Sequence, residues 1–122
     1  MSATKTHITR IGTVLVPVGD QDGALRFFTE TLGFETRIDG VFGEGERWIE
    51  VAPPGAETTI ALVDSQATGV SFATDNADAA HEELRARGVD VEPEVLRLGE
   101  GVPPMFTFRD QDGNRYRVVE RD

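Results

Sequence analysis

The feature that most constrains the fold is an internal repeat that covers most of the chain. A strand-helix-strand-strand-strand pattern occurs twice, and Asp20 and Gly33, which bound the first predicted helix, recur 55 residues later as Asp75 and Gly88. A repeat of this length indicates two copies of one supersecondary unit. One copy cannot easily bury the apolar face of its helix alone. We therefore expect both copies to fold as a single domain over residues 1–122.

The helix of each copy is predicted from its capping residue and its spacing. Asp20 is a suitable N-cap for the first helix, and Asn76 is the corresponding residue of the second. Leu25, Phe28 and Leu32 recur at helical intervals. This spacing predicts that all three side chains face the sheet.

Eight strands are predicted from runs of alternating or β-branched apolar residues. In the first copy they cover residues 11–18, 34–40, 46–52 and 58–63, and in the second 69–74, 89–96, 103–110 and 114–120. The pattern predicts an α+β fold of two tandem βαβββ modules, about 7–64 and about 65–122. Each helix should pack on one side of its sheet. Two curved sheets side by side then form a cupped eight-stranded mixed sheet with the helices outside, and ligand sites favour such concave surfaces.

Composition narrows the class of protein. The chain has 12 basic and 22 acidic residues, and its net charge of -10 disfavours nucleic acid and anionic membranes as partners. No cysteine is present, which excludes disulfides, thiol catalysis and Cys-ligated zinc. No apolar run approaches the roughly 20 residues that span a bilayer, and no secretory signal is recognised, so a cytoplasmic location is expected. Lys5 is the only lysine, a bias typical of GC-rich bacterial genomes.

Two segments carry a resemblance to a known family. The first is VLVPVGDQDGALRFFTETLGF, an apolar strand and an Asp followed by a helix that ends in Phe-x-x-x-Leu-Gly-Phe. The second is FRDQDGNRYRVVE, in which Gln111 replaces the usual Pro. Both resemble the vicinal oxygen chelate superfamily, which includes glyoxalase I, bleomycin-resistance proteins and extradiol dioxygenases. The resemblance implies the fold predicted above and a homodimer. It does not specify the reaction or the ligand, because this fold hosts many chemistries.

The resemblance also locates the places where metal-dependent members hold their ion. Those members have four inward-facing ligands, usually His or Glu, and the matching positions here are Thr13, Ala61, Gly69 and Arg117. Ala and Gly have no side-chain donor, Thr is a poor ligand, and Arg stays cationic. Divalent ions need deprotonated ligands, so we expect no metal and no other cofactor.

Arg117 lies on a strand face that is predicted to be buried, and a buried guanidinium needs an acidic or hydrogen-bonding partner. The pleat of residues 46–52 places Ile49 and Val51 on the helix-packed face, and Trp48 and Glu50 on the other face. Two interpretations of Arg117 stay open. It forms a structural pair with Glu50, or it is a fixed cation that accepts a carboxylate, phosphate or enolate-like oxygen of a ligand.

The residues predicted to bind the ligand line the concave sheet, and no catalytic residue is assigned. They are Thr13, Trp48, Glu50, Ala61, Gly69, Met105, Thr107 and Arg117. The leading hypothesis is a metal-independent small-molecule-binding protein that resembles the antibiotic-binding members of the superfamily. The alternative is a small lyase or isomerase acting on a carbonyl or carboxylate metabolite, with Arg117 as electrophile and Glu50 as base. A third hypothesis is a domain with a structural role only.

Overall fold

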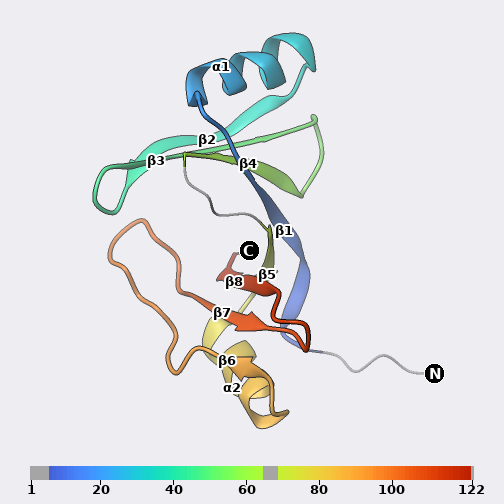
Figure 1. Cartoon of the computed structure of the whole chain (residues 1–122), viewed down its shortest axis with the longest axis vertical. Coiled ribbons are helices and arrows are strands. Elements are labelled where there is room, and N and C mark those ends of the chain that lie inside the picture. Colours follow the sequence, from blue (N-terminus) through green and yellow to red (C-terminus); the bar gives the residue numbers. More distant parts are fainter. Residues whose placement is uncertain (1–5, 65–68, 122) are drawn as a thin grey trace, which may run out of the picture. The chain divides into compact units, whose positions relative to one another are not determined.

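The computed structural model describes residues 6–64 and 69–121 (Figure 1). This part of the chain forms an α+β fold with one mixed sheet, in which eight strands are hydrogen-bonded in the order β2-β3-β4-β1-β5-β8-β7-β6. The predicted fold class is therefore confirmed. Contacts divide the chain into an N-terminal unit, Gly12–Val70, and a C-terminal unit, Met1–Ile11 with Ser71–Asp122. The predicted module boundary at 64/65 falls on residues 65–68, which lie outside the described residues.

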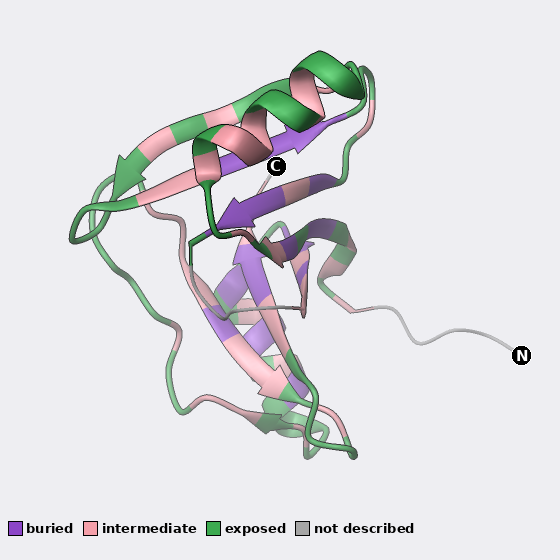
Figure 2. Ribbon diagram, turned by 45° about the horizontal axis from the view of Figure 1, so that its top comes forward, coloured by how far each residue is buried: buried purple, intermediate pink, exposed green. Residues whose placement is uncertain are grey.

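The N-terminal unit packs a helix on one face of a four-stranded sheet. Its elements are β1 (Ile8–Pro17, which begins in the C-terminal unit), α1 (Gln21–Arg26), the π-helix η1 (Phe27–Thr31), β2 (Glu35–Phe42), β3 (Glu46–Ala52) and β4 (Thr59–Val63). β3 is antiparallel to β2 and β4, and β1 runs parallel to β4. Ile49, Val51 and Leu62 form the core on the helix side, where Leu25 and Phe28 pack against them. Most residues of β3 and β4 are buried (Figure 2).

The first helix begins as predicted but ends differently. The Asp20 carboxylate accepts a hydrogen bond from the Gly23 N–H at 3.1 Å, which confirms the N-cap. After Arg26 the chain continues as a π-helix, in which the Leu32 N–H donates to the Phe27 carbonyl oxygen at 3.2 Å. A π turn holds more residues than an α turn, so it rotates the residues that follow. The prediction that Leu32 faces the sheet is therefore wrong, and its side chain is 47% exposed.

The C-terminal unit repeats this arrangement with a regular helix. Its elements are β5 (Gly69–Thr74, which begins at the unit boundary), α2 (Ala77–Ala86), β6 (Asp90–Val91), β7 (Met105–Arg109) and β8 (Arg115–Glu120). Asn76 caps α2 by accepting the Ala79 N–H at 3.0 Å. Leu84 of α2 packs on Phe106 and Val118 of the sheet. In the described part of the chain, no helix is long and apolar enough to cross a membrane.

β6 is much shorter than predicted. The prediction was a strand over residues 89–96, but only Asp90–Val91 forms one. The regular ladder stops at Glu92: its N–H donates to the Thr107 carbonyl oxygen at 3.0 Å, but its carboxylate, in place of its carbonyl oxygen, accepts the Thr107 N–H at 2.6 Å. The carbonyl oxygen of Glu92, which would continue the ladder, instead lies 2.6 Å from His81 Nε2. Beyond Pro93 the chain pairs with β7 once more, at Leu96, whose N–H donates to the Met105 carbonyl oxygen at 2.7 Å and whose carbonyl oxygen accepts the Met105 N–H at 3.1 Å.

Candidate functional site

Half of the predicted site residues lie on one sheet face of the N-terminal unit. β3 alternates as predicted, so Ile49 and Val51 pack toward α1 and Trp48 and Glu50 project from the opposite face. Glu50 lies directly opposite Ala61 of β4. Trp48 packs against an apolar cluster that includes Ala61. The face opposite α1 therefore combines an indole ring, a carboxylate and apolar side chains.

Glu50 is a buried carboxylate with specific partners. Its side chain is 1% exposed. The Trp48 Nε1–H donates to Oε2 at 2.7 Å, and the Thr59 hydroxyl donates to Oε1 at 2.7 Å. Hydrogen bonds to an ionised acceptor are short and strong, and they offset part of the cost of removing the charge from water. The hydrogen bond from Trp48 Nε1–H to Glu50 Oε2 also fixes the orientation of the Trp48 ring.

Thr13 joins this arrangement through Thr59. The two threonines are register partners on the parallel strands β1 and β4, and their hydroxyl oxygens are 3.0 Å apart. Because the Thr59 hydroxyl gives its single proton to Glu50, Thr13 donates to Thr59. The sequence analysis missed Thr59. The available signal was its position two residues before Ala61, on the same face of the strand.

The other predicted residues lie in or beside the sheet of the C-terminal unit. Thr107 of β7 lies directly opposite Arg117 of β8, and the alternate residues of both strands pack toward α2. Met105 shares this face because it lies two residues before Thr107. Arg117 is also the register partner of Ser71, a buried residue of β5 that was not predicted. Gly69 is the first residue of β5.

A family model matches residues 10–118, and it describes the Glyoxalase/Bleomycin resistance protein/Dioxygenase superfamily. The chain belongs to this superfamily. A relative, the uncharacterized protein YetH of Bacillus subtilis (strain 168), is 32% identical, over 93% of this chain and 99% of its own. Membership confirms the family inferred from the two sequence segments.

The chain is also similar to solved structures. Methylmalonyl-CoA epimerase from Mycobacterium tuberculosis has a TM-score of 0.80 at 22% identity, and the match covers 100% of this chain and 93% of the epimerase. TnmS3, an antibiotic binding protein from Streptomyces sp. CB03234, has a TM-score of 0.48 at 32% identity, with 97% and 100% of the two chains covered. The similarity to the epimerase confirms the fold alone.

The positions that hold metal in other superfamily members do not suit a divalent ion here. The Thr13 hydroxyl is hydrogen-bonded to Thr59, Ala61 and Gly69 offer no side-chain donor, and Arg117 is a cation. Within residues 6–64 and 69–121, no group of three or more His, Cys, Asp or Glu side chains could hold a metal ion. The donor set at these positions therefore does not fit a superfamily-type metal centre.

Each histidine has its own partner in the C-terminal unit. His7 Nδ1 is hydrogen-bonded to the Glu83 carboxylate, and this bond raises the pKa of His7 and lowers the pKa of Glu83. His81 Nε2 lies 2.6 Å from the Glu92 carbonyl oxygen, and its ring packs edge-on against Phe106. Both histidines thus have structural contacts.

Proposed function

We propose that this chain binds a small molecule on the sheet face opposite α1 and that it does so without a metal ion. The observation that carries the proposal is the buried Glu50 carboxylate, held by Trp48 and Thr59. Ionisable groups with burial and specific partners cluster at functional sites. Thr13 and Ala61 complete the proposed site. The remaining residues of the predicted site stay predictions from the sequence.

The proposed roles follow from the chemistry of each side chain. Trp48 offers a flat, half-buried ring on which an aromatic or cationic group can stack. Glu50 is a positioning residue, because its bond to Nε1 holds the indole in one orientation. Its negative charge also favours a cationic group on the ring. The site therefore suits a flat organic molecule with aromatic or cationic character.

Metal independence is supported by the donor chemistry of the chain. Side chains with no donor, or with a positive charge, stand at three of the four superfamily ligand positions, and the fourth is a threonine hydroxyl. Ligand binding is therefore expected to persist in EDTA. Elemental analysis of the purified protein should show no stoichiometric divalent metal.

Tryptophan fluorescence tests the proposal directly, because Trp48 is the only tryptophan of the chain. Titration with aromatic and cationic compounds, antibiotics included, is carried out in EDTA. At least one compound should quench the emission saturably and raise the melting temperature. Glu50→Gln removes the charge and should weaken that binding about tenfold.

Glu46→Gln is the matched control for this titration, because Glu46 is an exposed carboxylate on the same strand. It should bind as the wild type does. Quenching that disappears in EDTA and returns with added zinc would contradict metal independence. A library without any binder, or equal effects of the two substitutions, would contradict the site.

A lyase or isomerase is the second candidate function. It is favoured by Glu50, since a buried carboxylate is a group that can serve as a general base. Each binder found above is incubated with the protein and then analysed by NMR for a change in its bonds or stereochemistry. Turnover that Glu50→Gln abolishes would establish the enzyme, whereas recovery of the unchanged compound supports binding alone.

We also propose a homodimer, as the superfamily resemblance implies. Light scattering on the eluted protein should give twice the mass of one chain. A mass of one chain at micromolar concentration would contradict this.

A further inference from the structure

The β7–β8 hairpin places two arginines directly opposite each other. Arg109 and Arg115 are register partners on these antiparallel strands. Like charges in directly opposite positions of a sheet are destabilising. In a chain with 12 basic and 22 acidic residues, two guanidinium groups paired in this way require an explanation.

The carboxylates of the protein do little to neutralise this pair. The side chain of Arg115 is exposed and makes no ion pair or hydrogen bond with another described residue. Arg109 is 3.8 Å from Asp90, whose side chain is 71% exposed. An exposed ion pair at that distance is weak and screened by salt. Both guanidinium groups therefore keep donors available for an external acceptor.

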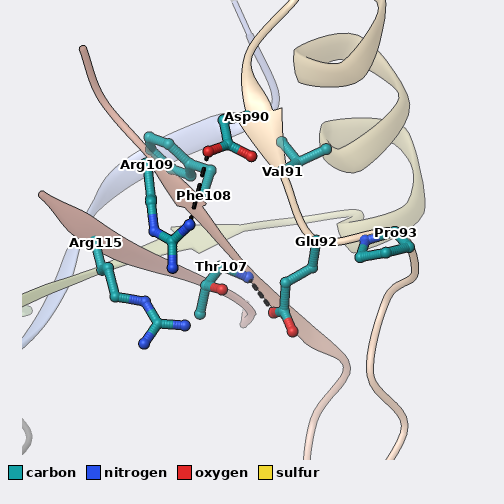
Figure 3. A pocket seen from close by; sticks show the side chains of 8 residues that line it. All are labelled: Asp90, Val91, Glu92, Pro93, Thr107, Phe108, Arg109 and Arg115. Atoms are coloured by element: carbon teal, nitrogen blue, oxygen red, sulfur yellow. Dashed lines mark hydrogen bonds and ion pairs between the residues drawn. The ribbon is translucent and has the colours of Figure 1, made fainter. Parts of the chain in front are cut away.

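The two arginines line a hollow in the C-terminal unit with a volume of about 220 Å³. Figure 3 shows both side chains reaching toward the same space beside Thr107. The Glu92 carboxylate also lines the hollow, but it is held by the Thr107 N–H at 2.6 Å. Apolar atoms come from Pro93 and two neighbours, Val91 and Phe108. The hollow is smaller than sites for drug-sized ligands, so it suits a small anion or one end of a larger molecule.

We propose that this hollow binds an oxyanion, the carboxylate or phosphate group of a small organic molecule, between Arg109 and Arg115. Guanidinium groups present planar forks of donors that match carboxylate and phosphate oxygens. A bound anion would also relieve the repulsion between the two arginines. The Thr107 hydroxyl is a further donor at the same place, and the apolar wall accommodates the organic part of the ligand.

This site stands on residues of the C-terminal unit alone. It does not require the Glu50 site, and neither proposal depends on the other. The acidic chain as a whole repels anions, so binding should be of modest affinity and sensitive to ionic strength.

NMR titration of the ¹⁵N-labelled full chain tests the proposal with two probes, inorganic phosphate and benzoate, at constant ionic strength set with sodium chloride. The arginine Nε–H resonances of Arg109 and Arg115 and the Thr107 amide should shift saturably with at least one probe. A response to phosphate alone or to benzoate alone identifies the preferred oxyanion. Arg109→Gln should weaken binding about tenfold, the loss expected for one charge-assisted contact.

Arg87→Gln is the matched control, because Arg87 is also exposed and lies 3.9 Å from its carboxylate partner, Glu83. It should leave the titration unchanged, and so should Glu50→Gln, which separates this site from the one under "Proposed function". Shifts that do not saturate with either probe would overturn the proposal. Equal weakening by Arg109→Gln and Arg87→Gln would also overturn it, because it would indicate only a general effect of charge.

Discussion

The sheet faces opposite the two helices are built from equivalent strands but carry opposite charges. In the N-terminal unit, β3 and β4 bring the buried Glu50 carboxylate together with Thr59 and Trp48. In the C-terminal unit, the corresponding strands β7 and β8 place Arg109 opposite Arg115. The repeated backbone decides which way side chains point. The residue types decide what each face can bind, so we propose two different recognition chemistries on one fold.

The two copies also differ in the length of one strand. β2 has eight residues and pairs along β3, whereas β6 has two residues beside β7. The β6 ladder ends at Glu92, whose carboxylate accepts the Thr107 N–H while its carbonyl oxygen lies beside His81 Nε2. The hollow proposed to bind an oxyanion is lined by Asp90 to Pro93, where the short strand stops. The side chain of Glu92 thus helps to make the second copy different from the first.

The largest difference in stability is expected when the buried Glu50 carboxylate of the N-terminal unit is removed. Glu50→Ala removes the acceptor of the half-buried Trp48 indole N–H. It leaves the buried Thr59 hydroxyl with a longer contact, 3.4 Å, to the Gly12 carbonyl oxygen. A buried polar group without a good partner costs about 1–3 kcal/mol. The free energy of unfolding, measured by urea denaturation with circular dichroism, should fall by on the order of 3 kcal/mol. Glu46→Ala, at an exposed position of the same strand, should change it by less than about 0.5 kcal/mol. Similar values for both variants would show that the buried cluster adds no stability.

A smaller change in stability, of opposite sign, is expected when one arginine of the Arg109–Arg115 pair is removed. Arg115→Gln removes the like-charge pair with Arg109, so the free energy of unfolding should rise by about 0.2–1 kcal/mol at low ionic strength. The gain should shrink in high salt, because salt screens the repulsion that is removed. A clear loss of stability in the same urea experiment would mean that Arg115 makes a favourable contact in the folded protein.

The smallest effect concerns the exposed pair of His7 and Glu83. The raised pKa of His7 gives stability that is lost as the pH rises through a value above 6.5, and the lowered pKa of Glu83 gives stability that is lost as the pH falls through a value below 4.5. The pair therefore stabilises most between about pH 4.5 and 6.5. In Glu83→Gln, the melting temperature should fall most within this window. A difference from wild type that is constant with pH would contradict an ionic contribution of the pair.

Local rules predicted much of the fold. Both N-caps and the alternation of β3 followed from the residues themselves, and the alternation placed Trp48 and Glu50 on one face. The prediction failed at Leu32 because a π turn changes the helical phase, which a fixed spacing of 3.6 residues does not anticipate. It also failed in the strand over residues 89–96, because periodicity does not anticipate that the Glu92 carboxylate takes the place of a backbone acceptor.

The sequence by itself determined the duplication, the superfamily and the direction in which each strand residue points, since these depend on short-range periodicity and on motifs. Only the tertiary structure decided which side chains meet. Thr59 reaches Glu50, and Arg109 faces Arg115, because of the register between neighbouring strands. Register depends on turn geometry and on packing between distant segments, and a shift of one residue would turn every side chain to the other face.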